Sequence, residues 1–373
     1  MQAGAATAPR AARRGAVPRT LAQLATSLTA ALATCAPAAR LPASPNPGWS
    51  ADTVWVAADR DGDALVELDG DLLVVARRPL AGPLHVRCGG GRTWVVHAPL
   101  GHPGGPQALR PWTARGPGPA LSVGEVLDLE VDARGAALVL ERDPRGAVRL
   151  GRAQPDGASC DLGAPPGAVA LALGARGPAL ALGTGGWAVA GCEGPWRVLG
   201  GLDGAEVLDL EPGPDGGWWT LERPRGEPEV LCVVRSPEGV PRAVWPVGRA
   251  RRLARRTAGA WAWEPDERLL FAPQGGPSRL AQAGARAAVG DGRGGLVVAA
   301  AGALLRLTFD GAAAPGQGGF ARLVDVERVA RDYSSPPSSL DAPGRRISYL
   351  RMRRHRVVRL TPSSRAASSR RRG

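Results

Sequence analysis

Acidic side chains recur at fixed places of a repeating pattern in this chain, and they are the residues best suited to chemistry. Short apolar runs alternate with turns, and the acids lie three residues after, or thirteen residues before, the residue that opens the second run of a repeat. These candidates are His97, Glu125, Glu141, Glu206, Glu222 and Glu264, with Asp59 one place later in the first repeat. Carboxylate oxygens can bind a divalent cation such as Ca²⁺, and a carboxylate can act as a general base. The pattern is therefore a candidate metal or catalytic site.

The repeat that carries these residues has a period near forty. Its second run opens at Trp55, Trp94, Leu138, Leu180, Trp219, Trp261 and Leu296. The runs lack the i, i+3, i+4 spacing of a helix and end at Gly, Pro or Asp, so they are predicted to be strands. A period of about forty residues with short strands is typical of β-propeller blades of about four strands each. We predict an all-β propeller over residues 52–330, with seven blades favoured over six or eight.

Ring closure is predicted from the two ends of the repeat region. The first unit begins at its second strand (Thr53 to Ala57), and the run Ala321 to Val326 resembles an inner strand without a blade of its own. Pairing these two segments would close the ring and leave no open sheet edge. With strands lettered A to D outward from the axis, the D–A and B–C loops open on one face. We call this face the loop rim, and the opposite face, with its A–B and C–D hairpins, the hairpin face.

The run from Val54 to Leu68, with Trp55 opening strand B and acids near its end, resembles the NHL-type repeats of bacterial propellers. The resemblance covers roughly residues 52–330 and implies the propeller fold. Because that family contains binding scaffolds as well as hydrolases and lyases, it implies no single function. The repeated Thr-Gly-Trp pattern of quinone-dependent dehydrogenase propellers is absent from this sequence.

The acids of the loop rim have two interpretations. In the functional one, His97 and the glutamates converge on a cation near the central channel. In the structural one, each acid next to an arginine, such as Glu141-Arg142 or Glu222-Arg223, accepts turn amide hydrogens and pairs locally. We favour the structural interpretation, because strand B lies one strand away from the axis and its side chains need not converge.

A second group of candidates is predicted to face the channel from strand A. It comprises His85, Asp128, Asp209 and Asp325, and the three aspartates occupy similar places of their repeats. An inward aspartate can bind a ligand in the channel or accept a hydrogen bond from a neighbouring blade, and we favour the second role. The tryptophans that open strand B are expected to pack between blades. Trp112, Trp187, Trp196 and Trp245 lie elsewhere in the repeat and are expected to form exposed contact surfaces.

The net charge of +13 is confined to the two ends of the sequence. Residues 1–40 contain five Arg and no acid, and residues 331–373 contain twelve Arg and two acids, so the remainder carries about −2. A propeller with that balance has no strong field that attracts phosphate, and we expect no nucleic-acid binding by the ring. The segment 331–373 is predicted to be a disordered basic tail or a basic arm for anionic lipid or nucleic acid.

The N-terminus is predicted to be an export signal. Basic residues precede an apolar stretch from Leu21 to Ala33, which is followed by a small-residue cleavage site, so residues 1–34 form a signal peptide or leader. Leu32-Ala33-Thr34-Cys35 resembles a bacterial lipobox, which makes Cys35 a candidate for lipidation. Residues 35–51 are a Pro- and Ala-rich tether. We expect a periplasmic or secreted protein, with a lipid anchor at Cys35 as the route to a membrane.

The four remaining cysteines show no metal-ligand spacing. Cys88, Cys160, Cys192 and Cys232 are expected to be free thiols, with one disulfide as the alternative. The chain contains no Lys, so it has no phosphate loop of the Walker type, and it has no nucleophile elbow and no H-E-x-x-H motif. The sequence favours a monomeric scaffold that binds a protein partner on the loop rim without a cofactor. The alternative is a metal-dependent hydrolase or lyase that uses the same rim.

Overall fold

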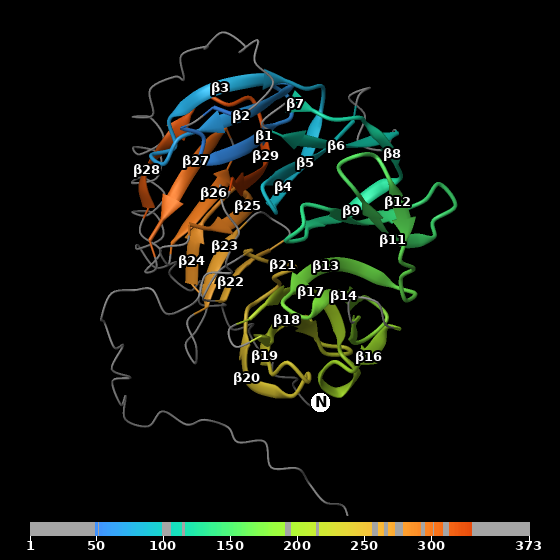
Figure 1. Ribbon diagram of the computed structural model, residues 1–373. Coiled ribbons are helices and arrows are strands. Elements are labelled where there is room, and N and C mark those ends of the chain that lie inside the picture. Colours follow the sequence, from blue (N-terminus) through green and yellow to red (C-terminus); the bar gives the residue numbers. More distant parts are fainter. Residues whose placement is uncertain are drawn as a thin grey trace, which may run out of the picture.

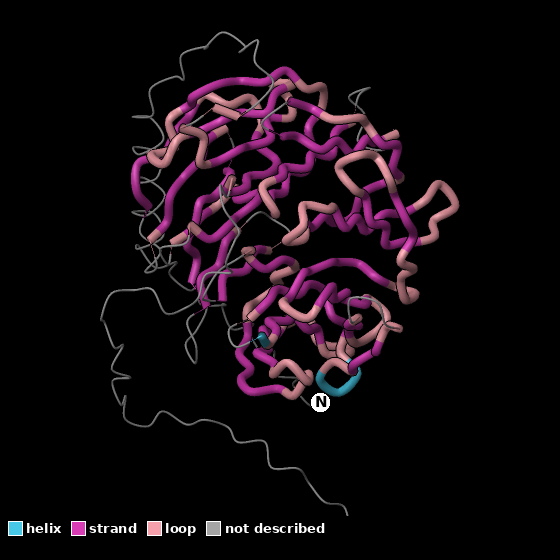
Figure 2. Tube along the Cα trace, in the orientation of Figure 1, coloured by secondary structure: helices cyan, strands magenta, loops and turns pink. Residues whose placement is uncertain are grey.

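Strands are the main secondary structure of the described residues in this computed structural model, and they form sheets arranged around a central axis (Figure 1, Figure 2). The structure describes residues 49–50, 52–98, 106–113, 116–190, 195–213, 216–255, 260–264, 268–272, 279–291, 295–300, 302–308 and 313–329. The leader, Cys35 and the tail therefore lie outside the described residues. In this part of the chain, no helix has the length and apolar character of a membrane span.

One sheet joins the two ends of the described chain. It contains, in order, β29 (Leu323–Arg328), β1 (Trp55–Asp59), β2 (Ala64–Leu68) and β3 (Val74–Pro79). Strand β29 pairs antiparallel with β1, with Val326 opposite Ala57 and Arg328 opposite Trp55. The predicted closure of the ring by N-terminal and C-terminal strands is confirmed, because this inner strand comes from the end of the repeat region.

Five further sheets have four strands in sequence order from the axis outward. They are β9 (Glu125–Val131), β10 (Ala137–Arg142), β11 (Val148–Ala153), β12 (Ser159–Asp161); β13 (Ala168–Gly174), β14 (Gly177–Leu182), β15 (Trp187–Val189), β16 (Arg197–Leu199); β17 (Glu206–Pro212), β18 (Trp218–Arg223), β19 (Leu231–Arg235), β20 (Pro241–Pro246); β21 (Arg252–Leu253), β22 (Ala260–Trp263), β23 (Leu269–Ala272), β24 (Arg279–Gln282); and β25 (Ala285–Gly290), β26 (Leu296–Ala300), β27 (Ala303–Leu307), β28 (Ala313–Gly318). A single 3₁₀ turn, Leu202–Gly204, is the helical element of the described residues.

The remaining sheet has five strands, so the described chain has six four-stranded blades where seven blades were predicted. It contains β4 (Pro83–Gly89), β5 (Arg92–His97), β6 (Gln107–Thr113), β7 (Gly116–Pro117) and β8 (Leu121–Val123). Strands β7 and β8 pair with successive parts of β6. The outer strand is split at Gly118-Pro119-Ala120, because proline has no N–H to donate to a ladder. Six sheets are four-stranded blades, and this one departs from the pattern.

The inner strands contact one another around the axis. Each of β29, β4, β9, β13 and β17 contacts the inner strand of the next sheet, and β25 contacts β29. Between β21 and β25 the contact is made just after β21, where Arg255 pairs in parallel with Val289 and its N–H donates to Ala288 O at 3.2 Å. The ring of inner strands is therefore continuous. We use the word channel for the axial region inside this ring, where buried charged side chains such as Arg87, Asp209 and Asp325 lie.

Trp55, Trp94 and Trp219, which open strands B, are buried as predicted, and the side chain of Trp261 lies outside the described residues. The expectation for three other tryptophans was wrong. Trp112, Trp187 and Trp245 are buried rather than exposed. Trp187 packs edge-on against Trp218 of the next sheet at 5.6 Å between ring centroids. Trp94 donates through Nε1 to Gly135 O at 2.9 Å, which joins two neighbouring hairpins. Large planar side chains are needed there because neighbouring sheets diverge outward from the axis.

We predict that Trp187→Ala lowers the free energy of unfolding by about 3 to 5 kcal/mol, because it removes a fully buried indole between two sheets. The matched control is Val198→Ala on β16 of the same sheet, where the side chain is 59 % exposed and the change should stay within about 0.5 kcal/mol. Urea unfolding followed by far-UV circular dichroism measures both. Equal losses in the two variants would contradict the packing described above.

Candidate functional site

The acids at the ends of strands B fasten the loops that lead into the inner strands. Glu141 Oε2 accepts the N–H of Gly124 at 2.6 Å, and Glu222 Oε2 accepts that of Leu202 at 2.7 Å. Glu264 Oε1 accepts the N–H of Arg249 at 2.9 Å. Asp59 Oδ1 accepts the N–H of Arg322 at 2.8 Å. In four sheets the acid therefore holds the D–A loop of its own sheet in place.

Arginines bind the other oxygens of these acids. Glu222 is fully buried and accepts from Arg235 Nε at 2.8 Å and Nη2 at 2.6 Å, and the Thr220 hydroxyl donates to it at 2.6 Å. Glu141 contacts Arg149 at 3.3 Å, and Glu264 is paired with Arg268. Each pair lies within one sheet or its turns. The carboxylates are thus held separately around the rim.

The two acids that begin strands A are paired at the surface. Glu125 accepts from Arg142 at 2.7 Å, and Glu206 is bound by Arg223 Nε at 3.0 Å. Both pairs join the start of the inner strand to the end of strand B. They are exposed or half-exposed, so solvent screens them and each contributes at most about 1 kcal/mol.

His97 is buried at the end of β5, in a sheet that contains none of the candidate glutamates. Burial lowers the pKa of its imidazole, so it is neutral at physiological pH. Among the described residues, no group of three or more His, Cys, Asp or Glu side chains is arranged to hold a metal ion. The structure therefore shows the six rim candidates in separate contacts rather than in one cluster.

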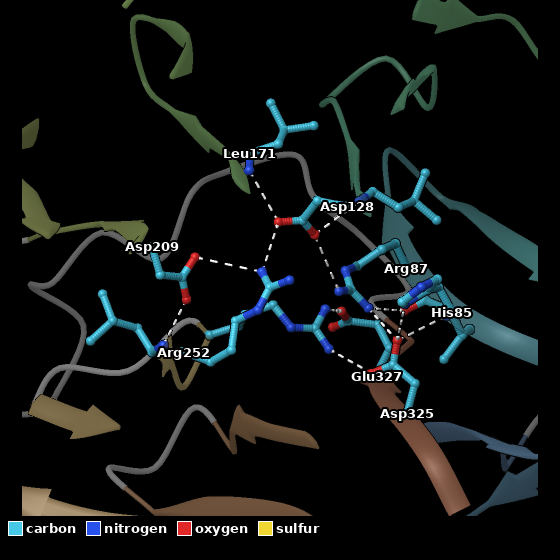
Figure 3. Close-up of polar contacts among 12 residues, drawn as sticks. His85, Arg87, Asp128, Leu171, Asp209, Arg252, Asp325 and Glu327 are labelled. Atoms are coloured by element: carbon cyan, nitrogen blue, oxygen red, sulfur yellow. Dashed lines mark hydrogen bonds and ion pairs between the residues drawn. The ribbon is translucent and has the colours of Figure 1, made fainter. Parts of the chain in front are cut away.

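The channel candidates are brought together, and each aspartate joins two neighbouring sheets (Figure 3). Asp128 Oδ2 accepts the N–H of Leu171 at 3.0 Å, and Asp209 Oδ2 accepts that of Leu253 at 2.7 Å. Asp325 Oδ2 accepts the N–H of Val86 at 3.1 Å. In all three cases the donor lies on the inner strand of the next sheet. The same hydrogen bond is thus repeated at three of the joints around the axis.

Three arginines connect these aspartates across the channel (Figure 3). Arg87 lies between Asp325, at 2.5 Å, and Asp128, at 3.8 Å. Arg252 lies between Asp128, at 3.4 Å, and Asp209, at 3.7 Å. These two guanidinium groups therefore link the three aspartates in a chain that crosses several sheets.

Arg255 completes the network on the β29 side. Its Nη2 donates to Asp325 Oδ1 at 2.9 Å, and its Nη1 donates to Glu327 Oε2 at 2.8 Å. His85 lies beside the same aspartate, with Nδ1 3.9 Å from Asp325 Oδ2. Asp325 is consequently the carboxylate with the most partners in the channel.

The environment divides the channel acids into two kinds. Burial alone would raise the pKa of Asp325, but Arg87 and Arg255 outweigh it and hold the pKa below its usual value. Burial raises the pKa of Asp209 to about 7, although Arg252 opposes the rise and Asp128 adds to it. Burial, with Glu130 nearby, raises the pKa of Glu211 well above its usual value. Burial also lowers the pKa of His85 to about 4.

Sequence reasoning missed the arginines of the channel and the glutamates next to the aspartates. A signal was available for the glutamates, because the runs Leu127–Val131, Leu208–Pro212 and Val324–Arg328 each carry Asp and Glu two residues apart. Residues i and i+2 of a strand share a face, so both acids point to the channel. The arginines carry no such repeat. Arg87, Arg252 and Arg255 come from two inner strands that differ in sequence from the other five.

Cys88 and Cys232 are free and buried, which matches the expectation of buried free thiols, whereas Cys160 is free but exposed. Cys192 lies outside the described residues. Burial raises the pKa of the Cys232 thiol, so it is protonated and unreactive.

The chain was compared with known proteins at the levels of sequence and structure. No protein-family model and no curated protein matches it. It is similar to the structure of apo AztD from Citrobacter koseri, with 12 % identity, a TM-score of 0.47, and coverage of 74 % of this chain and 98 % of that one. It is also similar to YCF48 bound to D1 peptide (15 %, TM-score 0.42, 80 % and 100 %) and to the Dos1 propeller (9 %, TM-score 0.45, 73 % and 79 %).

The sheets of this chain, arranged around an axis and closed by β29, are those of a β-propeller. At these identities and TM-scores the likeness to known structures concerns the fold alone. Function has to be argued from the residues of this chain.

We predict that Glu222→Gln destabilises the protein by about 3 to 5 kcal/mol, because it leaves the buried Arg235 without its counter-charge. The matched control is Glu125→Gln, which breaks an exposed pair and should cost at most about 1 kcal/mol. Chemical unfolding gives both values. A small effect at Glu222 would show that its carboxylate is not needed for the fold.

A second prediction concerns pH. The pKa of Asp209 is raised in the folded state, so folding is favoured when this group is protonated, and its contribution is lost as pH rises from about 4 to about 7. Asp209→Asn should therefore be the more stable protein at pH 7 and above, by roughly 2 to 4 kcal/mol, and the gain should vanish near pH 4. Thermal melts between pH 4 and 8 measure this difference.

The control is Asp325→Asn, for which the opposite is expected. The pKa of Asp325 is lowered, so its contribution is present above its unfolded pKa and is lost as pH falls through the folded value. Removing this charge leaves Arg87 and Arg255 without it and should destabilise the protein at neutral pH. The same pH response in both variants would contradict the assignment of two kinds of channel acid.

Proposed function

We propose that the protein is a binding scaffold that holds a protein partner on its loop rim. The observation that carries the proposal is that the acids of this rim fasten the D–A loops in four sheets, through Asp59, Glu141, Glu222 and Glu264. Loops that are fixed before binding lose little conformational entropy when a partner arrives. The rim acids thus support binding by shaping the surface.

Charged side chains at the rim are available for contact with a partner. Arg249 and Arg251 precede β21 and are exposed, and the Arg142–Glu125 pair is exposed at the rim end of the sheet that begins with β9. Arginine is enriched in protein interfaces because its planar guanidinium group binds carboxylates in two places. These residues favour a partner with acidic groups on its surface.

The proposal includes the organisation and location of the chain. The five-stranded sheet is taken as the seventh blade of one closed ring, and the protein is taken to act as a monomer. The leader and Cys35 support export to the periplasm or secretion, with a lipid anchor at that cysteine. The mass of the mature protein tests export, because cleavage after residue 34 would remove the leader.

The alternative function, a metal-dependent hydrolase or lyase, uses the same acids in a different way. It requires Glu141, Glu222 and Glu264 to leave their present amide and arginine partners and to bind a cation such as Ca²⁺. The contacts described above favour the scaffold, because each carboxylate already has donors within its own sheet.

The test is photo-crosslinking from matched positions on the two faces. Gly200 lies on the loop rim and Gly70 on the hairpin face, and a Cβ at either position meets nothing within 4 Å. A benzophenone side chain at Gly200 should capture one defined partner in the cells that make the protein, and the same group at Gly70 should not. Capture of the same partner at equal yield from both positions would contradict binding on the rim.

Cation binding distinguishes the two functions. Metal content and thermal melts with Ca²⁺, Mg²⁺ and Zn²⁺ should show no stoichiometric ion and no stabilisation of the scaffold. A bound ion that is lost in Glu141→Gln and Glu264→Gln would instead favour the enzyme.

A further inference from the structure

A β-bulge recurs at the same place of six inner strands, close to the loop rim. In β4, β9, β13, β17, β25 and β29 the pairing with the second strand of the sheet shifts near the start of the inner strand. Each shift leaves one residue of the inner strand without an opposite residue, and a bulge turns such a side chain out of the regular alternation. These extra residues are Leu84, Leu127, Val169, Leu208, Arg286 and Val324.

Five of the six extra residues are apolar, and their strands follow one another around the axis. In order they are β29, β4, β9, β13 and β17, each of which contacts the next (Figure 1). Val169 is 37 % exposed, and the other four are half-buried, with one side packed against the apolar cores between the sheets. Because inner strands begin at the loop rim, these side chains lie around the mouth of the channel. We name Val324, Leu84, Leu127, Val169 and Leu208 the apolar arc.

Arginines lie on the two inner strands that do not belong to the apolar arc. Arg286 is the extra residue of β25 and is half-exposed. Arg251 directly precedes β21 and is exposed. The mouth of the channel on the loop rim therefore has an apolar side, formed by five neighbouring strands, and a cationic side, formed by the other two.

The bulge does not by itself require an apolar residue. Arg286 occupies this position in β25 and leaves the strand paired with β26 along its length. The apolar residues of the other five strands remain half-buried or exposed, so their contribution to the core is incomplete. Apolar side chains that gather at a surface with charged residues beside them are typical of an interaction site.

We infer that the partner of the loop rim places a large apolar side chain against the apolar arc and a carboxylate of the same segment against Arg251 and Arg286. The inference rests on the proposed function and names the chemistry of the partner's contact. A buried apolar anchor supplies most of the affinity of many interfaces. A guanidinium group binds a carboxylate through two parallel hydrogen bonds, so an acid next to the anchor matches the cationic side of the mouth.

The first test uses the full chain with the benzophenone side chain at Gly200, and it measures the yield of the crosslink to the partner. The test variant combines Leu127→Gln and Val169→Gln, which lie on neighbouring inner strands. The yield should fall at least fivefold, because the amide groups replace apolar contacts at the mouth of the channel.

The matched control combines Leu73→Gln and Val240→Gln, which change the same residue types at exposed positions in turns of the hairpin face. The yield should stay within about twofold of the native protein. Because Leu127 is half-buried, thermal melts verify that both double variants are folded. An equal loss of yield in the two double variants would overturn the inference.

The second test changes the charge at an exposed residue and so leaves the core unchanged. Arg251→Glu should lower the crosslinking yield at least fivefold, because it repels a carboxylate of the partner. Its control is Arg134→Glu, in the exposed turn between β9 and β10 on the hairpin face, which makes the same change in net charge and should stay within about twofold. An equal loss in both would show that net charge alone governs binding and would overturn the inference.

The outcomes separate the inference from the proposed function. A crosslink from Gly200 that neither the double variant nor Arg251→Glu weakens would overturn the inference and leave the proposed function in place. Absence of a crosslink in the native protein would overturn the proposed function and the inference with it. A crosslink to a second copy of the chain would overturn the inference in favour of self-association. Loss of the crosslink on addition of equimolar decanoate would overturn it in favour of a small amphiphile.

Discussion

A buried aspartate that accepts an N–H from the next inner strand is the interaction on which the ring depends. Asp128, Asp209 and Asp325 each make this bond, and each lies on the inner strand of a different sheet. A propeller has no continuous hydrogen-bond ladder between its sheets, so the inner strands need side chains to join them. At Asp325, whose pKa is held below its usual value, the acceptor is ionised and therefore makes a stronger bond than a neutral acceptor would.

The joint between β29 and β4, which Asp325 makes, has two arginines bound to its aspartate. It also involves the strand that closes the ring. Strand β29 belongs by sequence to the end of the repeat region but forms the inner strand of the first sheet. If this strand were released, the ring would open between β29 and β4. Arg87 binds Asp325 from the β4 side and Arg255 binds it from across the channel. Burial raises the pKa of both aspartates. At Asp325, Arg87 and Arg255 outweigh burial and lower the pKa, whereas at Asp209 the opposing effect of Arg252 does not cancel burial and the pKa stays raised.

The sequence was sufficient for the fold class and for part of the site, because periodicity reports strands and turns. Strand β1 (Trp55–Asp59) overlaps the predicted segment Thr53 to Ala57, and the closing strand was found from a run without its own sheet. Glu141 accepts the N–H of Gly124, 17 residues earlier, and pairs with Arg149 on the next strand, while its neighbour Arg142 pairs with Glu125. The split outer strand of β7 and β8 was missed, since outer strands carry the weakest apolar signal. The burial of Trp187 was missed because a strand pattern does not show which neighbouring sheet covers a side chain.

Arginine partners could not be predicted for a different reason. Arg87 and Asp325 are 238 residues apart in the sequence, and nothing in either local pattern links them. Their contact depends on the number of sheets, the register of the inner strands and the depth of each side chain in the channel. These quantities are set by packing of the whole ring.

The position at which the ring is closed also determines on which face the two ends of the ring lie. Here the chain begins at strand B and ends at strand A, so the two ends meet where an A–B hairpin would otherwise lie, on the hairpin face. If the chain had begun at strand A and ended at strand D, both ends would have left through the loop rim and would have lain beside the loops that Glu141, Glu222 and Glu264 hold in place. Closure between A and B instead places Val54 and Val329 on the hairpin face, where the N–H of Val329 donates to Val54 O. The loops that Glu141, Glu222 and Glu264 hold therefore lie at the opposite end of the inner strands from both ends of the ring.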